Sequence, residues 1–244
     1  MTDISAFAQA LIAAHHSGTR VAPEAPLPQT PEEAYAVQEA VLAATGPVAG
    51  FKVGLKPDAA PIFGAIRAAF TQESGSTIAV ADQMGIELEV GWLITAPLPA
   101  PEAEDFDAAL RRAVVPVPVI ELVDTRVTGP AASDPMVKLA DFQVNHGLIC
   151  GTPRHDWDGR DFGAVTARLS AGVHADYAGA TEVPGGSALS TLAALIRTLN
   201  GACGGLKVGQ VVITGTLFPM FLAPGGTDIS GTIEGLGTVT LHLS

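Results

Sequence analysis

Alternation of apolar and polar residues is the clearest pattern in the second half of the chain. In residues 85–95, GIELEVGWLIT, apolar positions alternate with Glu87, Glu89 and Gly91, which is the period of a β-strand with one buried face. Similar patterns predict strands at 48–55, 77–82, 117–126, 146–151, 210–218 and 237–244, and weaker alternation predicts a hairpin within 156–180. The Gly-rich connection PGGTDISGTIEGLG, 224–237, is predicted to form turns.

Helical spacing is concentrated near the N-terminus. Residues 3–17 carry one apolar stripe and are followed by Gly18, and Thr30 precedes a second helix that ends before Gly46. Further helices are predicted at 101–114 and 187–205, whereas the type of 60–70 is uncertain. Strands dominate after residue 76 without regular alternation with helices. We therefore predict an α+β fold with a mixed or antiparallel sheet, divided into an N-terminal part, 1–75, and a main domain, 76–244.

Composition and charge exclude several classes of protein. The 244 residues are 48% hydrophobic and 16% charged, which is typical of an ordered globular chain. The net charge is −12 and the 13 basic residues are dispersed, so we expect no nucleic-acid binding. The cysteines, Cys150 and Cys203, have no spacing typical of a zinc or disulfide framework. Without a signal-like N-terminus or an apolar run of about 18 residues, we expect a cytoplasmic protein that does not enter membranes.

Acidic residues in apolar strands are the main candidates for chemistry. Glu87 and Glu89 share one strand face, and Glu121 lies in another apolar strand. Carboxylates on neighbouring strands could bind a hard cation such as Mg2+ or Mn2+, although the pair could equally line a solvated sheet face. Asp124 is out of phase with Glu121 and should point to the opposite face. Lys52, alone in the strand GFKVGL, could be a buried acid–base group or a lysine that reaches solvent at a sheet edge.

The histidines are weaker candidates. His15 and His16 are adjacent on the first predicted helix, so they cannot both face one site, and we expect both at the surface. Surface or loop positions are also expected for His155, His174 and His242. The glycines of GACGGLKVG lead to no P-loop Lys-Ser/Thr, and GGSALS lacks the second Gly of a nucleophile elbow. These motifs therefore indicate neither a nucleotide site nor a serine hydrolase.

Several segments together resemble a known family. In order along the chain they are EEAYAVQ, GFKVGL, IFGAI, IELEVGWLI, IELVDTR, LADFQVNHGLICG and GLKVGQVVITGTL. This series resembles the 2-keto-4-pentenoate hydratase branch of the fumarylacetoacetate hydrolase superfamily, which also contains 4-oxalocrotonate decarboxylases. The likeness runs from about residue 31 to the C-terminus. It implies a mixed β-roll with a smaller N-terminal helical part, and a homo-oligomer.

The resemblance also implies roles for individual residues. The implied ligands of Mg2+ or Mn2+ are Glu87, Glu89 and Glu121. Lys52 matches the active-site lysine, which transfers a proton or holds the substrate carboxylate, and Glu89 or Glu87 could orient water. His146 lies in a matched segment and could line the substrate pocket. The implied substrate-binding turn consists of Thr214, Gly215 and Thr216.

The implied activity is hydration of a 2-hydroxy-2,4-dienoate through an enolate that the metal stabilises. One departure from the family pattern keeps alternatives open, because family members usually have an Asp shortly after FG, whereas this chain has Arg67-Ala68-Ala69-Phe70. Phe142 also replaces a typical Asn. The alternatives are decarboxylation or tautomerisation of a related 2-oxo acid, or a catalytically silent homologue that binds 2-oxo acids or supports a paralogous hydratase or decarboxylase in a complex.

Overall fold

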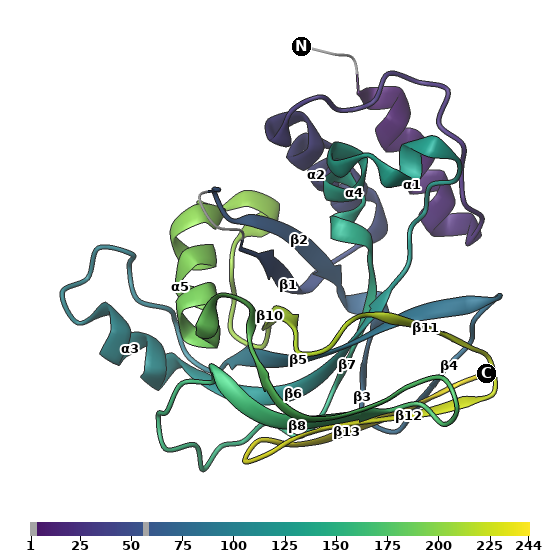
Figure 1. Ribbon diagram of the computed structural model, residues 1–244. Helices are drawn as coiled ribbons and strands as arrows, with labels where there is room; N and C mark the ends of the chain where they lie inside the picture. The colour runs from purple at the N-terminus through teal and green to yellow at the C-terminus, as the bar shows by residue number, and fades with distance from the viewer. Residues whose placement is uncertain (1–3, 56–58) are drawn as a thin grey trace.

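The computed structural model describes residues 4–55 and 59–244, and its N-terminal helices form where the sequence predicts them (Figure 1). Helix α1 spans Ser5–Ser17 and ends at Gly18, which adopts a left-handed φ of 69° and donates its N–H to Ala14 O. Helix α2 spans Pro31–Thr45, and the Thr30 side chain accepts a hydrogen bond from the Glu33 N–H, which confirms the predicted cap. Residue 3, at the start of the first predicted helix, lies outside the described residues.

An eight-stranded mixed sheet forms the centre of the molecule. Its strand order is β2-β1-β10-β5-β6-β7-β3, and β11 pairs with the N-terminal end of β5. The bounds are β1 Val48–Gly54, β2 Ile62–Arg67, β3 Thr71–Glu73, β5 Gln83–Ile94, β6 Val114–Val123, β7 Asn145–Cys150, β10 Val211–Thr216 and β11 Phe221–Pro224. Strand β1 is parallel to β10, and β3 is parallel to β7.

A second sheet of five strands packs beneath the first (Figure 1). Its order is β4-β13-β12-β8-β9, with bounds β4 Ser76–Ile78, β8 Ala164–Ser170, β9 Asp176–Glu182, β12 Thr227–Ile233 and β13 Gly237–Leu243. The remaining α-helices in the described residues are α3 Phe106–Ala113, α4 Pro135–Ala140 and α5 Ala188–Leu199. Helix α4 joins α1 and α2 in one group, while α5 lies against β1 and β10 (Figure 1). The predicted α+β class is confirmed.

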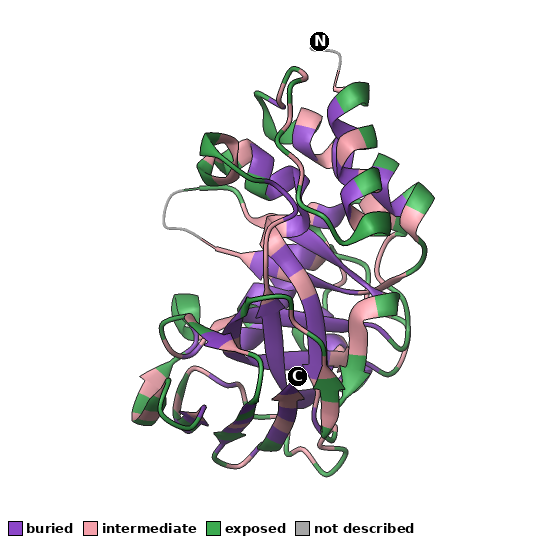
Figure 2. Ribbon diagram, turned by 90° about the vertical axis from the view of Figure 1, so that its right-hand side faces the viewer, coloured by how far each residue is buried: buried purple, intermediate pink, exposed green. Residues whose placement is uncertain are grey.

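The main core lies between the two sheets. The apolar face of β5, formed by Ile86, Leu88, Val90 and Trp92, is fully buried, as the alternating pattern predicts. On β12, a Cβ at Gly231 would come within 2.5 Å of Leu88, so a glycine lets the second sheet approach this close. Figure 2 shows that burial is concentrated where the strands of both sheets meet.

Some sequence predictions were wrong in their details. Residues 224–237 are not only turns, because they contain β12, in which Thr227, Ile229 and Ile233 are buried at alternating positions. Glycine, Asp and Ser between these residues hide the strand pattern. The predicted strand 77–82 is reduced to the end of β4, and the predicted helix 101–114 is reduced to α3. Segment 60–70 becomes β2 followed by a 3-10 turn, Ala68–Phe70.

The expectation of one buried face on β5 was also wrong. Glu89, on the face opposite Leu88, is only 2% exposed, because the curved sheet brings β2 close to β7 and encloses this side as well. The division at residue 75 remains a prediction, and hydrogen bonds join β1 with β10 and β3 with β7 across it. Within the described residues, no helix is long and apolar enough to cross a membrane.

Candidate active site

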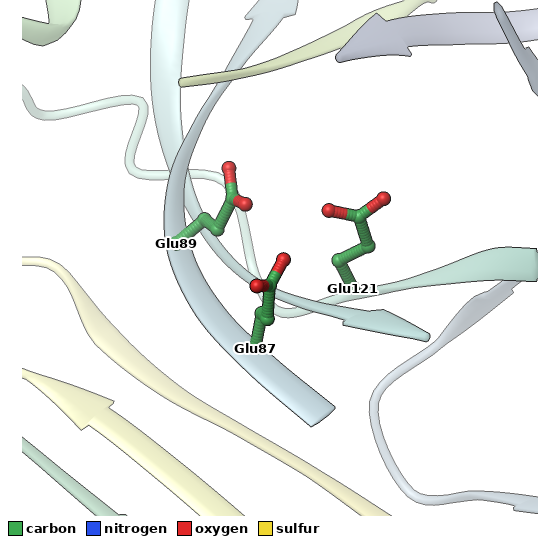
Figure 3. Close-up of side chains that lie close together, drawn as sticks. All are labelled: Glu87, Glu89 and Glu121. Atoms are coloured by element: carbon green, nitrogen blue, oxygen red, sulfur yellow. The ribbon is translucent and has the colours of Figure 1, made fainter. Parts of the chain in front are cut away.

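Three glutamates converge on the enclosed face of the curved sheet. Glu87 of β5 lies directly opposite Glu121 of β6 in the antiparallel register, and Glu89 follows two residues later on the same face of β5. One ligand oxygen from each of the three carboxylates lies within 4.8 Å of the others. Figure 3 shows the three side chains pointing toward one another from the two strands. The predicted grouping of these acids is therefore what the strand pairing produces.

Burial makes this acid cluster electrostatically unfavourable on its own. Glu121 is fully buried, and Glu87 is partly buried. Burial and the neighbouring Glu121 charge raise the pKa of Glu87 to about 7, and burial together with both other carboxylates raises the pKa of Glu89 well above its usual range. Positive charge at the cluster would relieve both effects.

Lys52 supplies part of that positive charge. Its strand, β1, is two strands away from β5, with β10 between them, and its Nζ lies 2.7 Å from Glu121 Oε1. Burial alone would lower the pKa of Lys52, but the carboxylates of Glu121, Glu87 and Glu89 offset this effect and raise it. The Lys52 ammonium is therefore charged at neutral pH, and its side chain is only 14% exposed. The alternative of a lysine that reaches solvent at a sheet edge is wrong.

The two oxygens of Glu121 have different surroundings. Oε1 accepts hydrogen bonds from Lys52 and from Asn145 Nδ2, the latter at 2.8 Å. Oε2 is buried and has no hydrogen-bond partner among the described residues. A buried carboxylate oxygen without a partner is costly, and a hard cation shared with Glu87 and Glu89 would satisfy it. This all-oxygen donor set therefore fits Mg2+ or Mn2+.

The turn at the end of β10 closes one side of the cluster. The Gly215 N–H donates to Glu89 Oε2 at 2.6 Å, while the Thr214 hydroxyl donates to Val90 O. Gly215 has a φ of +103°, and a Cβ there would lie 2.8 Å from Pro184, so a side chain would displace this N–H. The Thr216 hydroxyl donates to Phe218 O. Of the three predicted turn residues, Gly215 is thus the one that hydrogen-bonds to the acids directly.

Two site residues, Gln143 and Asn145, were missed in the sequence. Asn145 orients Glu121, and the Gln143 carbonyl accepts a hydrogen bond from Lys52 at 3.2 Å. Gln143 Nε2 is buried without a partner in the described part of the chain. Both belong to the segment FQVNHG before β7, and the signal that could have identified them is a pair of amide side chains two residues apart at a strand start.

The backbone around Gln143 is unusual. The three residues Phe142–Val144 have left-handed φ values of 52–57°, which is unfavourable for residues with side chains. On β2, a Cβ at Gly64 would approach Phe142 O to 2.4 Å, so the glycine allows this turn to pack against the sheet. The turn thereby places the Gln143 carbonyl against Lys52.

Other predicted candidates lie apart from the acid cluster. His146 lines a separate cavity, where its charged neighbours are Arg126, Asp124 and Arg67. Asp124 follows β6 and pairs with Arg20 at 2.6 Å, so it does not join Glu121. His16 is exposed as expected, but the surface prediction for His15 was wrong. Its Nε2 is fully buried, because α1 packs this side chain toward the same cavity.

The remaining histidines take no part in the acid cluster. His155 and His174 are exposed, as expected, and His242 is partly exposed and pairs with Asp228. Both cysteines are free thiols, and burial raises the pKa of each to about 12. These groups give no second candidate centre in the residues that the structure describes.

Comparison with known proteins decides the family. The TodF product hydratase of Pseudomonas putida F1 is 30% identical over 235 residues, which cover 86% of this chain and 82% of the hydratase. The chain belongs to the hydratase–decarboxylase branch of the fumarylacetoacetate hydrolase superfamily. A second member, the 2-hydroxyhexa-2,4-dienoate hydratase of Comamonas testosteroni, is 23% identical over 192 residues, with coverage of 75% and 70%. No family model matches the chain.

Solved structures confirm the superfamily fold. The 4-oxalocrotonate decarboxylase of Pseudomonas putida G7, complexed with magnesium and adipate, has a TM-score of 0.79 and 21% identity, covering 99% of this chain and 97% of that chain. The fumarylpyruvate hydrolase of Pseudomonas aeruginosa, in complex with Mn2+ and pyruvate, has a TM-score of 0.53 and 16% identity, with coverage of 79% and 88%. At these identities the likeness concerns the fold.

Proposed function

We propose that this protein is a divalent-metal-dependent hydratase that adds water to a 2-hydroxy-2,4-dienoate. The single observation that carries the proposal is the cluster of Glu87, Glu89 and Glu121, in which Glu121 Oε2 is buried without a partner beside the Lys52 ammonium. The named hydratase relatives supply the substrate class and the type of reaction, which is that of a carbon–oxygen lyase.

The three glutamates are the proposed ligands of Mg2+ or Mn2+. Such a cation supplies Lewis-acid chemistry, since it stabilises negative charge that develops on the oxygens of a 2-oxo acid. The protein's own contribution is to hold the carboxylates in place. Asn145 and Lys52 orient Glu121 through Oε1, and the Gly215 N–H orients Glu89 through Oε2.

Hydration requires proton transfers as well as a water molecule. A proton first moves from the 2-hydroxyl to C5 of the dienol, which gives a conjugated 2-oxo-3-enoate. Water then adds its hydroxyl group at C4 and a proton at C3. Because Lys52 is protonated and buried, it is suited to donate a proton or to hold the substrate carboxylate. Glu89, or Glu87, is the proposed group that orients water, and the turn 214–216 is proposed to contact substrate.

A second candidate is decarboxylation or tautomerisation of a related 2-oxo acid with the same metal. The observation that favours it is the stretch Arg67-Ala68-Ala69-Phe70, which contains no acid where the family resemblance implies an Asp. With a different set of proton-transfer groups, the same charge-stabilising centre could catalyse only part of the hydratase reaction. A homologue that binds 2-oxo acids without turnover is the third reading.

Isotope labelling with product analysis distinguishes these reactions. Freshly prepared 2-hydroxypenta-2,4-dienoate is incubated with the protein and Mg2+ in 18O-labelled water, and the products are analysed by mass spectrometry and NMR. A hydratase gives 4-hydroxy-2-oxopentanoate with label at C4, whereas a tautomerase gives 2-oxo-3-pentenoate, which has no oxygen at C4. Carbon dioxide released from 4-oxalocrotonate would support decarboxylation. No change in either compound with any metal would support a catalytically silent homologue.

We further propose a cytoplasmic homo-oligomer that acts in aromatic-compound catabolism through meta-cleavage, either alone or with a paralogous decarboxylase or hydratase. This proposal rests on the family resemblance. Light scattering coupled to size-exclusion chromatography tests the oligomer, and co-purification with the paralogue tests the complex.

A further inference from the structure

A cavity separate from the acid cluster lies between the end of α1, the turn after β2 and the segment that leads into β5. Its volume is about 490 Å3, and none of the three glutamates or Lys52 lines it. Its lining residues include His15, Arg67, Phe70, Ala79, Met84 and His146. Neither the proposed reaction nor the metal site uses this cavity.

Arg67 gives the cavity a buried positive charge that has no ion-pair partner among the described residues. The residue is only 7% exposed, and its guanidinium lies over the Phe70 ring at 4.2 Å from the ring centre. Among the described residues, no hydrogen bond or ion pair engages this guanidinium. Burial and the nearby Arg126 charge lower the pKa of Arg67 to about 10, against the opposite effect of the Asp141 charge, so Arg67 is still charged at neutral pH. A buried arginine normally has an anionic or carbonyl partner.

The other arginines around the cavity are already paired. Arg126 binds Asp141 with Nε–Oδ1 at 2.6 Å and also donates to the Asn145 carbonyl at 2.6 Å. Arg20 at the rim pairs with Asp124. One further acid, Asp82, lines the rim but is exposed to solvent and forms no ion pair with Arg67. Arg67 is therefore the lining arginine with a charge available to a ligand.

The remaining walls are apolar or neutral. Phe70, Val80 and Met84 supply apolar surface, and burial lowers the pKa of His15 to about 2 and that of His146 to about 4, so both imidazoles are neutral. His15 Nε2 is fully buried and has no described partner. A guanidinium fork with neutral hydrogen-bonding groups and apolar walls suits a carboxylate that carries an apolar body better than it suits phosphate.

We propose that this cavity is a second ligand site, which binds a small organic carboxylate through Arg67, with the apolar part of the ligand against Phe70 and Met84. The carboxylate would accept hydrogen bonds from the guanidinium, which has no oxygen partner among the described residues. The Phe70 ring holds the guanidinium from one side and leaves its edge for the ligand. This site would exist whether or not the metal centre is occupied.

Benzoate, titrated into the purified full-length protein by calorimetry, is a direct probe. The experiment is done once with Mg2+ and once with EDTA, because benzoate bound at the metal centre would be lost in EDTA. We expect one site that persists in both conditions and that binds inorganic phosphate more weakly. No binding in EDTA, or equal binding of phosphate, would overturn the carboxylate site.

Variants locate the binding. Arg67→Met should weaken benzoate by about tenfold or more, which corresponds to the loss of a charged hydrogen-bonding partner. Ala79→Trp, at an exposed rim position, should also weaken it by filling the entrance without disturbing the core, so the test holds even if Arg67→Met does not fold. Arg168→Gln, an exposed arginine paired with Asp176 elsewhere, is the matched control and should bind as wild type does. Unchanged affinity in a folded Arg67→Met, or in Ala79→Trp, would refute the assignment.

Discussion

Removal of the Lys52 ammonium should strongly destabilise the metal-free protein. In Lys52→Met, the fully buried Glu121 loses a partner at 2.7 Å, and the two other carboxylates lose the same compensating charge. Breaking a buried ion pair by removing one partner costs about 3–5 kcal/mol, and relief of the burial cost of Lys52 itself favours the lower end, about 3 kcal/mol. This is a large fraction of the roughly 5–15 kcal/mol that typically stabilises a domain.

Urea unfolding followed by circular dichroism measures this effect, in EDTA at pH 8, where Glu87 of the wild type, with its pKa of about 7, is mostly ionised. The matched control is Lys138→Met, an exposed lysine on α4, which should change the free energy of unfolding by less than about 0.5 kcal/mol. Mg2+ at about 100 times its Kd should then raise the free energy of unfolding of Lys52→Met by about 2.7 kcal/mol, because the cation binds the three glutamates only in the folded protein.

Activity provides an independent readout of the same substitution. Lys52→Met should lower dienol turnover by about 100-fold or more even with Mg2+, since the metal replaces the charge of the ammonium but not its proton. Lys138→Met should turn over substrate as wild type does. A Lys52→Met protein as stable as wild type in EDTA would refute the account of how the acids are held together.

Three further predictions concern residues around the acid cluster and the Arg67 cavity. Asn145→Ala should weaken Mg2+ binding by about 10–100-fold in calorimetry, because Glu121 loses its orienting hydrogen bond, and unchanged affinity would contradict that role. His146 has a folded pKa of about 4, below its usual 6.5, so the unfolded chain takes up the proton first as the pH falls. The contribution of His146 to the free energy of unfolding of wild type should therefore fall by about 1–2 kcal/mol between pH 7 and pH 5. A His146→Gln variant whose urea unfolding has the same pH dependence as wild type would refute this. Ala69→Asp should give no large gain in dienol turnover, because the turn that contains it borders the Arg67 cavity; a large gain would instead indicate a lost catalytic acid.

The acid cluster was predictable because it depends on strand period and pairing. Residues two apart on a strand share a face, so Glu87 and Glu89 had to lie together once the apolar face of β5 was buried. That Glu121 would lie opposite Glu87 depends on the register between β5 and β6, which the pattern of each strand alone leaves open. The family resemblance supplied this link, and also the role of Lys52.

Features that depend on close packing could not be predicted in the same way. Strand β12 carries glycine where it meets Leu88, which removes the apolar residue that would have completed its pattern. The left-handed turn at Phe142–Val144 is unfavourable locally and depends on Gly64 of a distant strand. The burial of His15 and Arg67 around one cavity likewise arises only when α1 packs beside the end of β2. These features come from contacts between segments far apart in the chain.

Absorbance of freshly generated 2-hydroxypenta-2,4-dienoate shows whether turnover depends on a metal held by the three glutamates. The decay of the dienol band is followed with wild type and with Glu87→Gln, in Mg2+ or Mn2+ and again in EDTA. We expect rapid decay only for wild type with metal, and slow, uncatalysed decay in the other three conditions. Equal decay in EDTA, or full activity of Glu87→Gln, would contradict a reaction that depends on a metal bound by these glutamates.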